Sequence, residues 1–169
     1  MSASPEAWLA GPLPGVIALL QPAAHAIEQV RRDLPPLLRT LSVERIWARP
    51  GTSASIGYHA VHLAGSLDRL FTYARGAALT DEQRDALARE RAIDEEQPEM
   101  ERIIALLEGA LGAALEQLGR TSEEELIVHR EVGRGRAPST TLGLLFHGAE
   151  HSARHAGQIV TLVRVTERA

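Results

Sequence analysis

The sequence contains neither cysteine nor lysine, and each absence removes a class of chemistry. Without cysteine, the chain can form no disulfide, no thiolate metal site and no cysteine nucleophile. Without lysine it offers no Schiff base and no lysine base, and all 18 basic residues are arginines. The G-x-S-x-G motif of serine hydrolases is also missing. A bound metal ion is therefore the strongest remaining source of catalytic chemistry.

Long apolar runs are missing too, although hydrophobic residues make up 44% of the 169 residues. No run approaches the roughly 18 residues that a membrane-spanning helix needs. Residues 1–11 lack the basic region and apolar block of a secretion signal. The net charge is −4 and no basic stripe typical of nucleic-acid binding is present. We therefore expect a soluble cytoplasmic protein with neither a membrane nor a nucleic-acid partner.

Apolar residues recur at helical spacing in four long stretches. These stretches predict helices at about residues 14–33, 56–75, 95–118 and 140–166. Long helices with short connections indicate an all-α fold, a four-helix bundle with short extra helical turns and connecting loops. We expect one such domain over residues 12–169, preceded by a flexible arm over residues 1–11.

Prolines and charged residues predict how these helices are interrupted. Pro22 is expected to kink or break the first helix, and Pro35 with Pro36 to end it. Residues 80–83 form a capping box that opens a charged segment reaching Glu96. We expect this segment to be a solvated helix and linker, with a functional acidic patch as the alternative. Strand character is confined to residues 126–132, and residues 133–138 are expected to form a loop.

The most informative stretch lies near the C-terminus, where His147, His151 and His155 follow one another at steps of four residues. Residues four apart lie one turn apart on the same side of a helix, so His151 and His155 can direct both imidazoles to one point. Such a pair is a common way to supply two nitrogen ligands to a divalent metal. His147 lies about 12 Å of helix rise from His155 and is expected on the rim of the site or beside a ligand.

A third imidazole is expected from the predicted helix at residues 56–75, which contains His59 and His62. At about 100° per residue, His59 lies nearer to the apolar stripe of that helix than His62 does. The spacing alone leaves both residues open as the third ligand. A site with three protein ligands would keep coordination positions for water or substrate.

Two further readings concern the last helix. Residues 147–151 match H-x-x-E-H, an inverted zinc-protease pattern in which Glu150 would be the general base, and a zinc hydrolase is kept as a minor alternative.

The helix is also apolar nearly all round, which predicts burial on most sides. We expect it to serve both the bundle and a subunit interface, so a homodimer is predicted. His25 and His129 have no partner pattern and are expected to be surface or hydrogen-bonded residues.

The stretch Ser55 to Leu70, SIGYHAVHLAGSLDRL, together with His151, His155 and the following Gly-Gln pair, resembles the DinB-like/YfiT superfamily. The resemblance extends over about residues 14–165. It implies a four-helix bundle, often dimeric, that binds a divalent metal through three histidines. Carried over to this sequence, the metal ligands are His62, His151 and His155, with His59 as a reserve ligand. Gln158 would orient a ligand or pack between helices.

The function that follows depends on what three neutral imidazoles do to a metal ion. They leave its full charge in place, which lowers the pKa of a bound water toward about 7 and would act likewise on a thiol. The resemblance implies thiol-dependent S-transferases and a maleylpyruvate isomerase among the relatives. We therefore expect a metal-dependent enzyme that activates a small thiol or water, most simply a thiol S-transferase. Zinc and nickel are the first candidates for the metal and iron a further one.

Two alternatives to an enzyme stay open. The first is a non-catalytic metal-binding or stress-related interaction protein on the same scaffold. The second is a plain helical bundle whose histidines only form hydrogen bonds.

Overall fold

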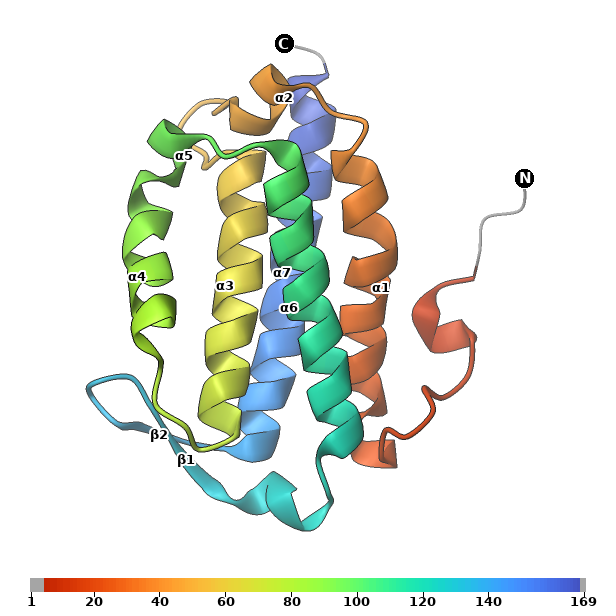
Figure 1. Ribbon diagram of the computed structural model, residues 1–169. Coiled ribbons are helices and arrows are strands. Elements are labelled where there is room, and N and C mark those ends of the chain that lie inside the picture. Colours follow the sequence, from red (N-terminus) through yellow and green to blue (C-terminus); the bar gives the residue numbers. More distant parts are fainter. Residues whose placement is uncertain (1–4, 168–169) are drawn as a thin grey trace.

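Four long helices form the body of the protein, whose computed structural model describes residues 5–167 (Figure 1). Helices α3 and α1 each pack against both α6 and α7, so the buried side chains of all four meet in one core. The predicted helical bundle is confirmed. Its long members are α1 (Gln21–Leu38), α3 (Ile56–Ala74), α6 (Met100–Arg120) and α7 (Thr141–Thr166).

Shorter elements close the ends of the bundle and line one side. Helix α2 lies near the end of α7, and α4 runs beside α3 (Figure 1). Within the described part of the chain, no helix is both long and apolar enough to cross a membrane. The short elements are η1 (Ala7–Leu9), η2 (Ala18–Leu20), α2 (Val43–Trp47), α4 (Asp81–Arg89), η3 (Glu90–Ala92), α5 (Ile93–Glu96), η4 (Glu124–Ile127), β1 (His129–Val132) and β2 (Ala137–Thr140).

Of the stretch with predicted strand character, residues 126–132, only His129–Val132 forms a strand, because Leu126 and Ile127 belong to the 3-10 helix η4. Strands β1 and β2 pair antiparallel, with His129 opposite Thr140 and Val132 opposite Ala137. The loop predicted over residues 133–138 is therefore shorter than expected, because Ala137 and Pro138 belong to β2. Gly133 and Arg136 take positive φ angles of 67° and 49° and make the turn between the strands.

The first helix departs from prediction at both ends. It begins at Gln21, so Pro22 lies in its first turn and neither kinks nor breaks it. Gly15, with φ of 78°, stops a helix from starting earlier. Pro35 and Pro36 lie inside the helix and do not end it. The helix continues because the carbonyl of Pro35 still accepts the N–H of Arg39 at 3.2 Å.

Polar caps fix the start of the two helices that carry the histidines. The hydroxyl of Ser55 accepts the N–H of Tyr58 at the start of α3, and that of Thr140 accepts the N–H of Gly143 at the start of α7. The capping box predicted at Thr80 and Gln83 is formed at the start of α4. Helices α3 and α7 therefore begin within one residue of the positions predicted from the sequence.

The connection between α3 and α6 returns along the bundle. Figure 1 shows α3 and α6 running in the same direction, with α4 carrying the chain back beside α3. Helix α4 has no buried residue, as expected for a solvated segment, but Glu90 and Ile93 just after it are buried. The prediction that the whole charged segment is solvated was therefore wrong, because its end turns inward against α3.

Candidate metal centre

Three histidines from two helices converge inside the bundle. His62 comes from α3, and His151 and His155 come from α7. Each offers a ring nitrogen, and these three atoms lie within 4.8 Å of one another. Among residues 5–167, this is the group of histidine and acidic side chains arranged so that it could hold a metal ion. We call it the three-histidine cluster.

Helix geometry and a close contact between helices assemble the cluster. On α7, the rings of His151 and His155 stack with centroids 4.5 Å apart and planes 17° apart. The ring of His62 lies with its centroid 5.3 Å from that of His151 and 4.8 Å from that of His155. A Cβ on Gly148 of α7 would lie 2.8 Å from the Phe71 ring of α3. The absence of a side chain there lets the two helices approach closely enough for the rings to meet.

An ion pair on the far side of His62 anchors this ring. Nδ1 of His62 lies 2.9 Å from Oε2 of Glu90, which is only 6% exposed. Arg69, two helical turns further along the same face of α3, donates from Nη1 to Oε1 of Glu90 at 2.5 Å. Burial alone would raise the pKa of Glu90, but the hydrogen bonds from His62 and Arg69 outweigh it and lower the pKa. The carboxylate is therefore ionised at neutral pH.

His59 lies beside the cluster and contacts one of its members. Its Nδ1 lies 2.9 Å from Nδ1 of His155, so one of these nitrogens carries the hydrogen and the other accepts it. The sequence left both His59 and His62 open as the third ligand. Of the two, His62 belongs to the group that could hold a metal. The preference for His59 from helix counting reflects its deeper burial, since His59 is 9% exposed.

Burial favours the uncharged form of the His155, His151 and His59 rings by lowering their pKa values. Burial, followed by the repulsion of His62, His151 and His59, lowers the pKa of His155 to about 4. Burial is also the main cause of the lowered pKa values of His151 and His59. Neutral imidazoles present free nitrogen lone pairs, which is the form that binds a metal ion.

One atom of the cluster lacks a hydrogen-bond partner. Nδ1 of His151 is buried, and residues 5–167 supply nothing that pairs with it. A buried polar atom without a partner costs about 1–3 kcal/mol. A divalent ion bound by the cluster fits this environment, because it would bring a positive centre to neutral, partly desolvated nitrogens.

The other residues predicted at the site lie around it. His147 is exposed, its ring and that of His151 form a T-shaped pair with centroids 5.6 Å apart, and its Nδ1 is 3.7 Å from Oε2 of Glu150. Glu150 forms an ion pair with Arg154 on the outer side of α7, so it lies outside the cluster. An H-x-x-E-H hydrolase would need His147 as a metal ligand, but the group that could hold a metal contains His62 and His155 beside His151. Gln158 is exposed and lines a hollow beside His59.

The two histidines without a partner pattern lie away from the cluster. Nε2 of His25 is 2.9 Å from the carbonyl of Gly11. His129 is exposed on β1. Both expectations of surface or hydrogen-bonded histidines agree with these positions.

Two hollows open near the cluster, one beside its member His151 and one beside the neighbouring His59. One of about 240 Å³ is lined by His151 and His147 together with Tyr73 and Leu87. The other is lined by His59, with Arg154 and Gln158 on α7. The half-buried cluster is thus open to small molecules through the hollow at His151.

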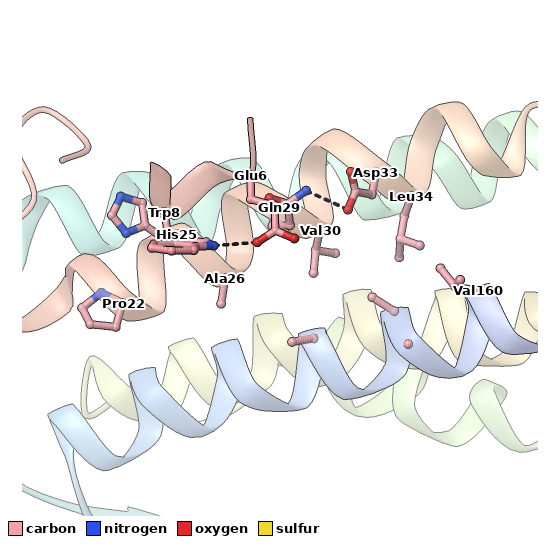
Figure 2. A pocket seen from close by; sticks show the side chains of 13 residues that line it. Glu6, Trp8, Pro22, His25, Ala26, Gln29, Val30, Asp33, Leu34 and Val160 are labelled. Atoms are coloured by element: carbon pink, nitrogen blue, oxygen red, sulfur yellow. Dashed lines mark hydrogen bonds between the residues drawn. The ribbon is translucent and has the colours of Figure 1, made fainter. Parts of the chain in front are cut away.

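A larger hollow lies between α1 and α7 and contains none of the cluster residues (Figure 2). It has a volume of about 750 Å³. Figure 2 shows Val30 and Leu34 of α1 facing Val160 of α7, with Trp8 at one end. Of the predicted arm, residues 1–4 lie outside the described residues, while Ala7 is buried and donates its N–H to Oε1 of Gln29 at 2.7 Å.

Glu90 is the residue of the centre that sequence reasoning missed. Its segment is rich in charge, and an average over such a segment indicates exposure. The available signal was Ile93 three residues later, because residues three apart share a helical face. A buried isoleucine at that spacing places Glu90 on the inward side.

Comparison with known proteins gives two matches. The family described as the DinB superfamily matches residues 26–159. The solved structure of the colibactin self-resistance protein ClbS, in complex with a double-stranded DNA, aligns with a TM-score of 0.58 and 18% sequence identity. The alignment covers 83% of this chain and 92% of that one. At this identity the likeness concerns the fold alone. No curated protein sequence matched.

Proposed function

Because this chain belongs to the DinB superfamily, we propose that it binds a divalent metal ion through His62, His151 and His155 and uses it in an enzymatic reaction. One observation carries the proposal. Three imidazole nitrogens from two helices lie within 4.8 Å of one another, in surroundings that keep two of the rings neutral. No carboxylate is part of this donor set, so the charge of the ion would not be reduced by its ligands.

The chemistry proposed is the activation of a small thiol, with water as the second possibility. When bound, a divalent ion of this kind acts as a Lewis acid and lowers the pKa of a water or thiol that reaches it. The chain has no cysteine or lysine nucleophile, and in this proposal the substrate brings the nucleophilic group. The hollow beside His151 and Tyr73 is the entry that we propose for it. A thiol S-transferase is the simplest enzyme that combines these features.

The chain's own residues would bind and orient. Glu90 holds the ring of His62, and His59 contacts that of His155. The donor set suits zinc or nickel, and iron is a further candidate, since all three accept imidazole ligands. The non-catalytic alternative would use the same metal without turnover. The ClbS structure contains DNA, but we do not propose DNA as a partner of this chain. The net charge of this chain is −4, which does not favour binding to phosphates.

Metal content measured on matched variants tests the proposal. The purified protein is expected to hold close to one equivalent of a divalent metal by elemental analysis. His62→Ala and His155→Ala should each lose most of it, because two imidazoles bind far more weakly than three. His129→Ala, which removes an exposed histidine from the hairpin, should retain it. A stoichiometric metal content in both cluster variants would show that the ligands lie elsewhere.

Turnover separates the enzyme from the non-catalytic alternative. Conjugation of a low-molecular-weight thiol to an electrophile should be lost on chelation and restored by adding the metal. Full metal occupancy with no thiol-dependent turnover would favour the non-catalytic protein.

A further inference from the structure

We propose that Glu90, held by Arg69, is a positioning residue that fixes the ring tautomer of His62, so that Nδ1 carries the hydrogen and Nε2 keeps its lone pair for the cluster. This inference deepens the proposed function and rests on it for the role of the free nitrogen. The tautomer itself is a property of the metal-free protein. It follows from three contacts made by the buried carboxylate.

The first step is the direction of each hydrogen bond. An arginine side chain only donates, and Arg69 contacts both oxygens of Glu90, at 2.5 Å from Nη1 and 3.3 Å from Nη2. Paired in this way, the carboxylate is ionised and can only accept. The 2.9 Å contact between Oε2 and Nδ1 of His62 therefore requires a hydrogen on Nδ1. In a neutral imidazole the other nitrogen, Nε2, then has a free lone pair.

The second step is that the carboxylate has little freedom to move. Glu90 is 6% exposed, and its two oxygens lie against α3. Gly65 of α3 leaves the room for them, because a Cβ at this position would collide with Oε1 of Glu90 and with Nη1 of Arg69. The ion pair thus fits into a gap that only glycine provides.

The third step concerns the ring of His62. It stacks on the Tyr58 ring with centroids 5.6 Å apart and planes 5° apart. Together with the bond to Glu90, this stacking holds the ring in one orientation. A metal ligand whose other nitrogen is bound to a carboxylate is both oriented and made more basic.

The Glu90→Gln variant is expected to reverse the direction of the hydrogen bond to Nδ1 of His62 while keeping the size of the side chain. The amide has one accepting oxygen, and the cationic Arg69 competes for it more strongly than a neutral imidazole does. The amide NH2 then faces Nδ1 of His62, which has to accept the hydrogen bond. His62 would change to the tautomer with hydrogen on Nε2, and the lone pair that faces the cluster would be lost.

Nitrogen-15 NMR of the metal-free protein at alkaline pH, where a free imidazole is neutral, reads the tautomer directly. The signal of His62 is assigned by its loss in His62→Gln. Wild type should show the hydrogen on Nδ1, and Glu90→Gln should show it on Nε2. Competition titration with Zn²⁺ should give an affinity lowered by roughly 10- to 100-fold in Glu90→Gln.

Glu150→Gln is the matched control, because it removes the same charge near the cluster from a residue that pairs with Arg154. It should change the affinity for Zn²⁺ less than threefold, roughly the scatter expected for a surface charge. Hydrogen on Nε2 of His62 in wild type would overturn the inference whether or not the variant folds. So would an unchanged tautomer in a folded Glu90→Gln protein. Wild type with hydrogen on Nδ1 but no affinity for metal would instead reject the proposed function and leave the tautomer assignment standing.

Discussion

At the scale of single residues, the centre combines groups whose protonation is decided by burial. His155 has its pKa lowered to about 4, whereas the value in an unfolded chain is near 6.5. Between these two pH values the unfolded chain binds a proton that the folded protein does not. The contribution of His155 to stability is therefore complete above about pH 6.5 and is lost as the pH falls toward 4.

This difference predicts that the metal-free protein is destabilised by mild acid in a way that His155→Gln is not. Between about pH 7 and about pH 5, wild type should lose about 1 kcal/mol more unfolding free energy than the variant, after allowance for partial exposure of the ring. Urea denaturation at the two pH values measures the difference. His129→Gln, on the exposed hairpin, should follow wild type. Equal pH dependence in wild type and His155→Gln would contradict the lowered pKa.

The residues of the centre differ in how far the sequence predicts them. The pair His151 and His155 follows from one number, the spacing along one helix. The choice between His59 and His62 depends on how α3 is rotated against α7, which no spacing within α3 contains. Glu90 depends on the path of a connection that returns to α3, and its charged neighbours conceal it. Spacing predicted the local geometry, the grouping of His62 with the α7 pair came from the family resemblance, and the contact with Glu90 was not predicted.

At the scale of elements, the contact between α3 and α7 decides whether the three imidazoles meet. Caps made the starts of these helices predictable, because Ser55 and Thr140 satisfy backbone N–H groups at fixed positions. The start of α1 was misjudged because the left-handed conformation of Gly15 overrides the helical spacing of the apolar residues around it. Gly148, where α7 meets Phe71, has a role that the sequence alone does not show.

A methyl group at Gly148 should therefore damage both stability and the site. In Gly148→Ala the new Cβ would press on the Phe71 ring, and we expect a loss of about 1–3 kcal/mol of unfolding free energy. Gly112→Ala on α6 is the control, since its Cβ would meet no atom within 4 Å and alanine favours a helix. Chemical denaturation measures stability, and metal titration measures the site. A Gly148→Ala protein as stable as Gly112→Ala would mean that α3 and α7 can separate without cost.

At the scale of the whole molecule, one side of the bundle is less well covered than the sequence suggests. Helix α7 is apolar nearly all round, yet Phe146 on it is 59% exposed. The hollow between α1 and α7 is lined mainly by small and apolar side chains, and Trp8 near its end is also exposed. A single chain thus leaves apolar surface of α7 facing solvent, which is unfavourable unless something covers it.

The homodimer stays a prediction, and the α1–α7 face is where we expect a second copy to pack. Wild type should sediment as a dimer at micromolar concentration. Val160→Glu places a charge in the hollow, where association would have to bury it, and should give a monomer. Val165→Glu puts the same charge on the same helix at an exposed residue that does not line the hollow, and should remain a dimer. A monomeric wild type would reject the homodimer. A dimeric Val160→Glu would place the interface on another face, and because the cluster lies inside one bundle, neither result would alter the metal content expected per chain.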